Sequence, residues 1–143
     1  MWFFWRQGRK ALQPASKNVD LMDRTAWGEA RGEGSRGMQA VINVIQNRVK
    51  KGGWWGATVE DVVKKKAQFS CWNENDVNRE KMLAVTESDA QFKEAVRLAT
   101  LAEIGQLRDI TGGATNYHAA SVSPAWAKKL TQTAKIGNHI FYA

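Results

Sequence analysis

Apolar residues recur at helical spacing in the first half of the chain. The pattern predicts one helix from about Val19 to Ala30 and a second that Ser35 can cap and that ends in the Lys50–Gly53 segment. One face of the second helix is apolar and carries Met38, Val41, Ile42, Ile45 and Val49. The other face carries a row of amides at i, i+4 and i+8: Gln39, Asn43 and Asn47.

Capping signals predict two further helices. Thr58 is followed by two acidic residues and starts a short third helix with its valines turned inward. Ser88 and Gln91 form a capping box for a longer helix that runs to about Ile104.

The pattern changes after Gly112-Gly113. Residues 114–119 and 136–142 have the character of short strands, and Ser123-Pro124 starts one more helical turn between them. The predicted class is therefore mainly α (α+β), with a small β element near the C-terminus. We expect a single domain over residues 19–143, preceded by an aromatic and basic arm over residues 1–18.

The net charge of +7 is concentrated in one part of the sequence. Residues 1–66 hold 13 Lys and Arg against 6 Asp and Glu, whereas residues 67–143 hold 8 of each kind. Such a positive field attracts polyanions: nucleic acid, anionic lipid or an anionic cell envelope. The single cysteine, Cys71, excludes an intrachain disulfide and a cysteine zinc site. The apolar run at the N-terminus is too short for a signal peptide or a membrane span.

Two carboxylates stand four residues apart in the segment Trp27-Gly28-Glu29-Ala30-Arg31-Gly32-Glu33-Gly34. Glu29 falls at the predicted C-terminus of the first helix, where the helix dipole favours cations and gives a carboxylate no support. Partial burial there would favour the protonated form that a general acid needs. The alternative is a pair of solvated glutamates beside a helix C-cap.

Several kinds of chemistry compete for the remaining polar residues. Nucleophilic catalysis is disfavoured, because no G-x-S-x-G segment exists and Ser70 has no local base. A metal site is only weakly indicated, since His118 and His139 lie 21 residues apart and no H-E-x-x-H motif is present. For both histidines, a structural hydrogen bond and a catalytic role stay open.

Glycoside cleavage by a carboxylic acid fits the residues better. It needs a glutamate in a cleft, amides for sugar hydroxyls and aromatic rings for sugar faces, and the sequence offers all of these. Trp54-Trp55, next to Gly52-Gly53, is the aromatic pair that we place at the edge of such a cleft.

Six segments of the sequence follow one another in the order in which they occur in a known family. They are Gly28–Glu33, Gly37–Val41 running into Asn47-Arg48-Val49, Gln68–Trp72, Gly113–Ala119, Pro124–Ala127 and Ile136–Tyr142. On these segments the chain resembles the cell wall hydrolase family of the spore-cortex-lytic type (SleB/CwlJ-like), over about residues 20–142.

The resemblance implies a lysozyme-like domain that cuts the glycan strands of peptidoglycan with no cofactor and no metal ion. Family members resemble lytic transglycosylases, so Glu29 is the expected catalytic acid/base for the β-1,4 bond between N-acetylmuramic acid (MurNAc) and N-acetylglucosamine (GlcNAc). Capture of the sugar by water would give a muramidase product, and the sequence leaves both outcomes open. We expect Glu33 to support the site, by substrate contact or by holding the loop. The other expected cleft residues are Asn43, Gln68, Ser70, Tyr117 and His118.

The sequence also departs from the family's usual architecture, since no peptidoglycan-binding repeat and no export signal are visible. A basic domain of this kind resembles a phage endolysin, made in the host cytoplasm and released by a holin to the cell wall or periplasm. We expect a monomer that meets the anionic envelope through its basic N-terminal half and binds no nucleic acid. The alternatives are a virion-borne wall-piercing lysin, an N-acetylmuramoyl-L-alanine amidase, and a non-enzymatic basic binder of envelope or nucleic acid.

Overall fold

The fold was analysed in a computed structural model, which describes residues 16–143. Most of the predicted N-terminal arm, residues 1–15, lies outside the described residues. The elements in chain order are α1 (Lys17–Ala30), η2 (Arg31–Glu33), α2 (Gly34–Lys51), η3 (Gly53–Trp55), α3 (Val59–Val63), η4 (Ser70–Trp72), α4 (Val77–Ala84), α5 (Ala90–Glu103), β1 (Asn116–Ala119), η5 (Ala125–Lys129), β2 (Gln132–Ile136) and β3 (His139–Tyr142).

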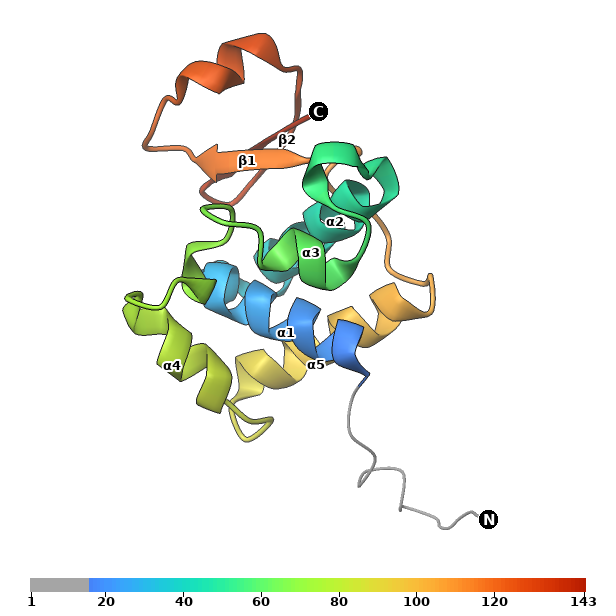
Figure 1. The fold of residues 1–143 in the computed structure, drawn as a ribbon, viewed down its shortest axis with the longest axis vertical. Helices are drawn as coiled ribbons and strands as arrows, with labels where there is room; N and C mark the ends of the chain where they lie inside the picture. The colour runs from blue at the N-terminus through green and yellow to red at the C-terminus, as the bar shows by residue number, and fades with distance from the viewer. Residues whose placement is uncertain (1–15) are drawn as a thin grey trace.

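The helices form one body, and a small sheet lies beyond one end of it, as Figure 1 shows. The main apolar core lies between the helices and includes Met22, Ala26, Ile42 and Leu98. The sheet is antiparallel in the order β1-β3-β2. A second apolar cluster joins the sheet to α2 and consists of Ala40, Val44, Ala114, Ile136 and Phe141. The predicted class, mainly α with a C-terminal β element, is confirmed.

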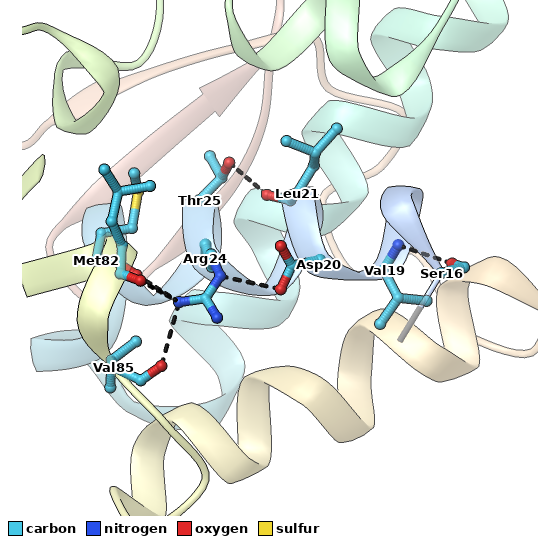
Figure 2. A network of polar contacts seen from close by, with 9 residues as sticks. Ser16, Val19, Asp20, Leu21, Arg24, Thr25, Met82 and Val85 are labelled. Carbon is cyan, nitrogen blue, oxygen red and sulfur yellow. Dashed lines mark hydrogen bonds and ion pairs between the residues drawn. The ribbon is translucent and has the colours of Figure 1, made fainter. Parts of the chain in front are cut away.

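Polar contacts hold the start and the middle of α1 (Figure 2). The hydroxyl of Ser16 accepts a hydrogen bond from the backbone N–H of Val19, so the helix begins at Lys17, slightly before the predicted start. Farther along, Arg24 donates to the carbonyls of Met82 (2.6 Å) and Val85 (3.2 Å) at the end of α4. One guanidinium thus satisfies carbonyls that the helix itself leaves unpaired, and it holds α4 against α1.

Two of the predicted helix caps are wrong. α2 begins at Gly34, directly after the 3₁₀ turn η2, so Ser35 lies inside the helix instead of capping it. α5 is capped by Asp89, whose carboxylate accepts from the N–H of Phe92 at 2.9 Å, and not by Ser88. The prediction for Thr58 is confirmed, since its hydroxyl accepts from the N–H of Asp61.

The C-terminal strand prediction needs correction as well. Residues 136–142 are not one strand, because Gly137 adopts a positive φ of 56° and turns the chain between β2 and β3. β2 escaped prediction because only Ile136 of its five residues is buried. α4 also escaped prediction, since Met82 is its one buried residue and leaves no apolar stripe.

Asp23 is a carboxylate on the buried side of α1, with only 1% of its surface exposed. Within the described part of the chain, its Oδ1 has no hydrogen-bond partner. Burial, together with the negative charge of Asp20, raises the pKa of Asp23 to about 8. The native protein therefore holds a proton there that the unfolded chain releases at much lower pH, so this group lowers stability as pH rises from about 4 to about 8.

Replacing Asp23 with Asn should stabilise the fold more at pH 8 than at pH 5, because the amide never carries the buried charge. We expect the variant's gain in free energy of unfolding, relative to wild type, to grow by on the order of 1 kcal/mol per pH unit over this range. Urea unfolding at the two pH values measures it. A difference that stays constant between pH 5 and pH 8 would contradict the account of Asp23.

Candidate functional site

Glu29 lies in the last turn of α1, as predicted, and its carboxylate is held from two sides. The hydroxyl of Tyr117 in β1 donates to Oε1 at 3.2 Å, and the backbone N–H of Cys71 in η4 donates to Oε2 at 3.2 Å. The first helix, the central loop and the C-terminal sheet therefore meet at one carboxyl group.

Gly28 makes this meeting possible. A Cβ atom at this position would lie 2.9 Å from Cβ and 3.1 Å from Sγ of Cys71. Both distances are too short for ordinary carbon and sulfur contacts, so any side chain there would push η4 away from α1. The glycine before Glu29 thus lets the N–H of Cys71 reach the carboxylate.

A pocket of about 320 Å³ opens in front of Glu29. Its lining combines one carboxylate, one guanidinium, two amides, a phenol and an indole. The lining residues are Glu29, Arg48, Ala67, Gln68, Asn116, Tyr117 and Trp126. Ala67 adopts a left-handed backbone conformation (φ 66°), which is uncommon for a residue other than glycine, and residues in such sparsely populated conformations cluster at functional sites.

Tyr117 serves as a hydrogen-bond donor to Glu29. Its ring stacks on Phe141, at 5.4 Å between centroids, and meets the edge of His139 at 5.2 Å. Burial, reinforced by the negative charge of Glu29, raises the pKa of Tyr117 well above its ordinary value. The phenol therefore keeps its proton and donates a hydrogen bond to the carboxylate.

Trp126 owes its position to a cluster of aromatic rings on the other side of the sheet. The ring of His118 stacks on Tyr142 at 5.3 Å, and the Trp126 indole meets both rings edge-on. Nδ1 of His118 lies 2.7 Å from the carbonyl oxygen of Ala119, so it carries a hydrogen, and Nε2 lies 2.8 Å from the Tyr142 hydroxyl. His118 does not line the pocket; it supports a residue that does.

The thiol of Cys71 is buried beside the site. Burial and the nearby charge of Glu29 raise its pKa well above the ordinary value, so it stays protonated and is a poor nucleophile. Ser70, also expected in the cleft, lies exposed at the start of η4 and is not among the lining residues.

Asn43 has a different place from the one predicted. It is 2% exposed, its Nδ2 donates to the carbonyl of Arg108, and its Oδ1 accepts from the N–H of Ile110. Its neighbours in the amide row, Gln39 and Asn47, also bind backbone carbonyls of the segment that leads into β1. The amide row of α2 therefore braces this segment, and Asn43 is not a cleft residue.

Glu33 also binds backbone. Its carboxylate accepts from the N–H of Asn138 at 2.8 Å and from Nδ2 of the same residue at 3.3 Å, in the turn between β2 and β3. The hydrogen bond from the Asn138 backbone lowers the pKa of Glu33, so the group remains ionised. Of the two roles expected for Glu33, holding the chain is the one that these contacts favour.

Four lining residues were not predicted as site residues: Arg48, Ala67, Asn116 and Trp126. Arg48, Asn116 and Trp126 all fall within the segments that carry the family resemblance, and Arg48 also carries a local signal. It continues the apolar stripe of α2 at i+3 from Ile45, so a charge falls where a core residue is expected. Trp54-Trp55, which we placed at the cleft edge, does not line the pocket, but the ring of Trp55 lies against the guanidinium of Arg48 at 3.9 Å.

Within residues 16–143, no three His, Cys, Asp or Glu side chains come together in a way that could hold a metal ion. None of the helices there is long and apolar enough to cross a membrane.

Replacing Gly28 with Ala should lower the free energy of unfolding by about 1–3 kcal/mol, because the new Cβ overlaps Cys71. The Cys71 amide resonance should shift as its bond to Glu29 lengthens. Gly32 provides the control in the same motif: a Cβ there meets nothing within 4 Å, so its change to Ala should cost less than about 0.5 kcal/mol. Thermal unfolding and amide NMR measure both, and equal effects of the two variants would refute the close-approach argument.

Comparisons with known proteins identify the fold and the family. The catalytic domain of the germination-specific lytic transglycosylase SleB from Bacillus anthracis has a similar structure, with a TM-score of 0.67 and 26% sequence identity, over 91% of this chain and 97% of that one. The catalytic domain of the Bacillus cereus SleB protein gives a TM-score of 0.68 and 26% identity, over 92% and 93% of the two chains. A comparison with curated protein sequences finds no match. The sequence profile of the cell wall hydrolases matches residues 32–142, and the chain belongs to this family.

Proposed function

We propose that this protein degrades peptidoglycan by cleaving the β-1,4 glycosidic bond between MurNAc and GlcNAc, as a lytic transglycosylase in which Glu29 is the acid/base. Membership of the cell wall hydrolase family and the similarity to SleB catalytic domains support the substrate and the reaction class. The family match begins at residue 32, so the role of Glu29 rests on its position in the pocket.

The observation that carries the proposal is that Glu29 is the one carboxylate among the residues that line the described pocket. Glycosidases with two catalytic carboxylates place them on opposite sides of the scissile bond. Glu33, the nearest acidic residue in sequence, instead binds the β2–β3 turn. A single carboxylate fits a reaction in which the substrate supplies its own nucleophile.

The steps follow from this arrangement. Protonated Glu29 donates its proton to the glycosidic oxygen as the bond to C1 of the muramic acid breaks, and GlcNAc leaves with a free hydroxyl. The resulting carboxylate then accepts the proton of the C6 hydroxyl of the same muramic acid. The C6 oxygen bonds to C1, which closes a 1,6-anhydro ring and returns Glu29 to its protonated state.

The other pocket residues have supporting roles. Tyr117 and the Cys71 N–H fix the direction in which the Glu29 carboxyl points, which is the main requirement for proton transfer to one atom. The amides of Gln68 and Asn116 offer donors and acceptors for sugar hydroxyls, and the indole of Trp126 offers a flat surface for a sugar ring.

A muramidase is the second candidate, with water in place of the C6 hydroxyl and the same glutamate as acid. An amidase of the MurNAc–L-alanine bond fits less well. Such an enzyme needs a bound metal ion or an activated nucleophile, and the lining of the described pocket includes no histidine, cysteine or serine.

Replacing Glu29 with Gln should reduce glycan cleavage by at least about 100-fold, because the amide cannot donate and take back the proton. The change is close to isosteric, so folding should be retained. The exposed Glu80 of α4 provides a control: its change to Gln should leave the rate unaltered.

Mass spectrometry of digested peptidoglycan distinguishes the reactions. Anhydro-muramyl products that disappear in the Glu29 variant are the expected result. Reducing muramic ends without the anhydro mass would identify the enzyme as a muramidase and not as a lytic transglycosylase. Free stem peptides, or cleavage that survives the substitution, would overturn the proposal.

The charge distribution supports a further part of the proposal, namely that the basic N-terminal half draws the enzyme to the anionic cell envelope. Raising the ionic strength from 0.01 M to 0.15 M shortens the screening length from about 30 Å to about 8 Å. The rate on whole cell walls should therefore fall severalfold, whereas the rate on short soluble glycan fragments should change little. An equal salt dependence of the rate on both substrates would contradict the proposed attraction to the envelope.

A further inference from the structure

Arg48 is a buried cation fixed in the wall of the pocket. The side chain extends from the last turns of α2, and the residue is only 4% exposed. Its Nε donates to the carbonyl oxygen of Thr115 at 2.7 Å, just before β1 begins. The guanidinium lies over the ring of Trp55 at 3.9 Å and near that of Phe69 at 5.1 Å. These contacts determine both the plane and the direction of the group.

Two nitrogens of the guanidinium have no hydrogen bond among the described residues. Within residues 16–143, Nη1 is buried without a hydrogen-bond partner, and the described hydrogen bonds of Arg48 involve neither Nη1 nor Nη2. Burial lowers the pKa of Arg48 to about 10, so the group remains cationic at neutral pH. A buried cation with unpaired donors is costly, and Arg48 lines the pocket, so a ligand bound there can supply an acceptor.

The charge of Arg48 is balanced in part by Glu29. Both residues line the same pocket, and the negative charge of Glu29 stabilises the guanidinium. The proposed reaction begins with Glu29 protonated and therefore neutral. At that stage no opposite charge in the pocket balances Arg48. A hydrogen-bond acceptor on the substrate then stabilises the guanidinium most.

We infer that Arg48 binds an acyl oxygen of the sugar next to Glu29. This inference rests on the proposed function. Sugar hydroxyls are weak acceptors, whereas an acyl oxygen has a strong dipole and two lone pairs in the plane of its group, which suit the planar guanidinium edge. Peptidoglycan offers this chemistry close to the ring in two places: the N-acetyl group at C2 and the lactyl group at C3 of muramic acid.

Such a contact would make Arg48 a positioning residue. It would hold the sugar by a substituent of its ring, and so fix the glycosidic oxygen relative to the Glu29 carboxyl. Lysine would keep the charge at this position but lose the fixed planar donors, so Arg48→Lys separates the two properties.

The test compares kcat/KM of wild type and Arg48→Lys on three soluble substrates: MurNAc–GlcNAc oligomers, the same oligomers without N-acetyl groups, and chitin oligomers, which lack the lactyl group. The kcat/KM of wild type should fall at least about tenfold when the recognised acyl group is absent. Arg48→Lys should be slow on the complete substrate but lose no more than about twofold on removal of that same group. The recognised acyl group is the one whose removal brings the kcat/KM values of wild type and Arg48→Lys close together.

Two outcomes separate the inference from the function on which it rests. If Arg48→Lys keeps the full wild-type sensitivity to both groups, Arg48 has only a structural role and the inference is wrong. If wild type cleaves none of the muramic oligomers, the proposed function itself is wrong. Lys51→Met, on the exposed end of α2, is the matched control and should behave as wild type throughout.

A second measurement needs no substitution of Arg48. In the Glu29→Gln variant, the Nε–H resonance of Arg48 should shift when N-acetylated muramic disaccharide is added. Disaccharide that lacks the recognised acyl group should cause a much smaller shift at equal occupancy. An unchanged Arg48 resonance with bound, fully acylated sugar would overturn the inference, including in the case that Arg48→Lys does not fold.

Discussion

The position of the Glu29 carboxylate depends on how closely α1 approaches η4. The two elements touch at Gly28 and Cys71 with no room for another methyl group, and this distance allows a backbone N–H to reach the carboxylate. α1 is also the central helix of the core and is tied to α4 through Arg24. Because protein interiors are close-packed, a shift of the core helix would move the proposed acid together with it.

The pocket lining carries two opposite charges, on Glu29 and Arg48. Tyr117, in the same lining, stays neutral because burial and the negative charge of Glu29 raise its pKa. Trp55 and Phe69 lie against Arg48 and keep water from much of it. Electrostatic interactions are stronger in such surroundings than in water. Each change in the protonation of Glu29 therefore changes the electrostatic stabilisation of the Arg48 guanidinium.

Local patterns in the sequence were sufficient for the elements that bury an apolar stripe and insufficient for the others. α1 and α2 were predicted because their core faces repeat at helical spacing, and that spacing also placed Glu29 at a helix end. β2 has no such pattern, because it is polar and lies at an edge of the sheet.

The site itself was only partly visible in the sequence. The amide of Asn43 could serve a sugar or a backbone equally well, and its actual partners lie 65 and 67 residues away. Arg48 was not predicted, because a charge inside an apolar stripe marks an unusual position but does not say what the charge contacts. The hydrogen bonds that define the pocket join segments distant in sequence. Helical and strand periodicity relate only residues a few positions apart, so they cannot predict these bonds.

The bond between Tyr117 and Glu29 spans 88 residues, and β1 is held in place by β3, which forms from residues 139–142. Helices close through local contacts and form quickly, whereas pairing between distant segments must first overcome a larger loss of chain entropy. The single helices can form by such local contacts, but the packing of α1 on α5 and the pairing of β1 with β3 both join distant segments. A molecule in which β1 has not yet paired with β3 lacks the Tyr117 contact to Glu29, so its site is incomplete.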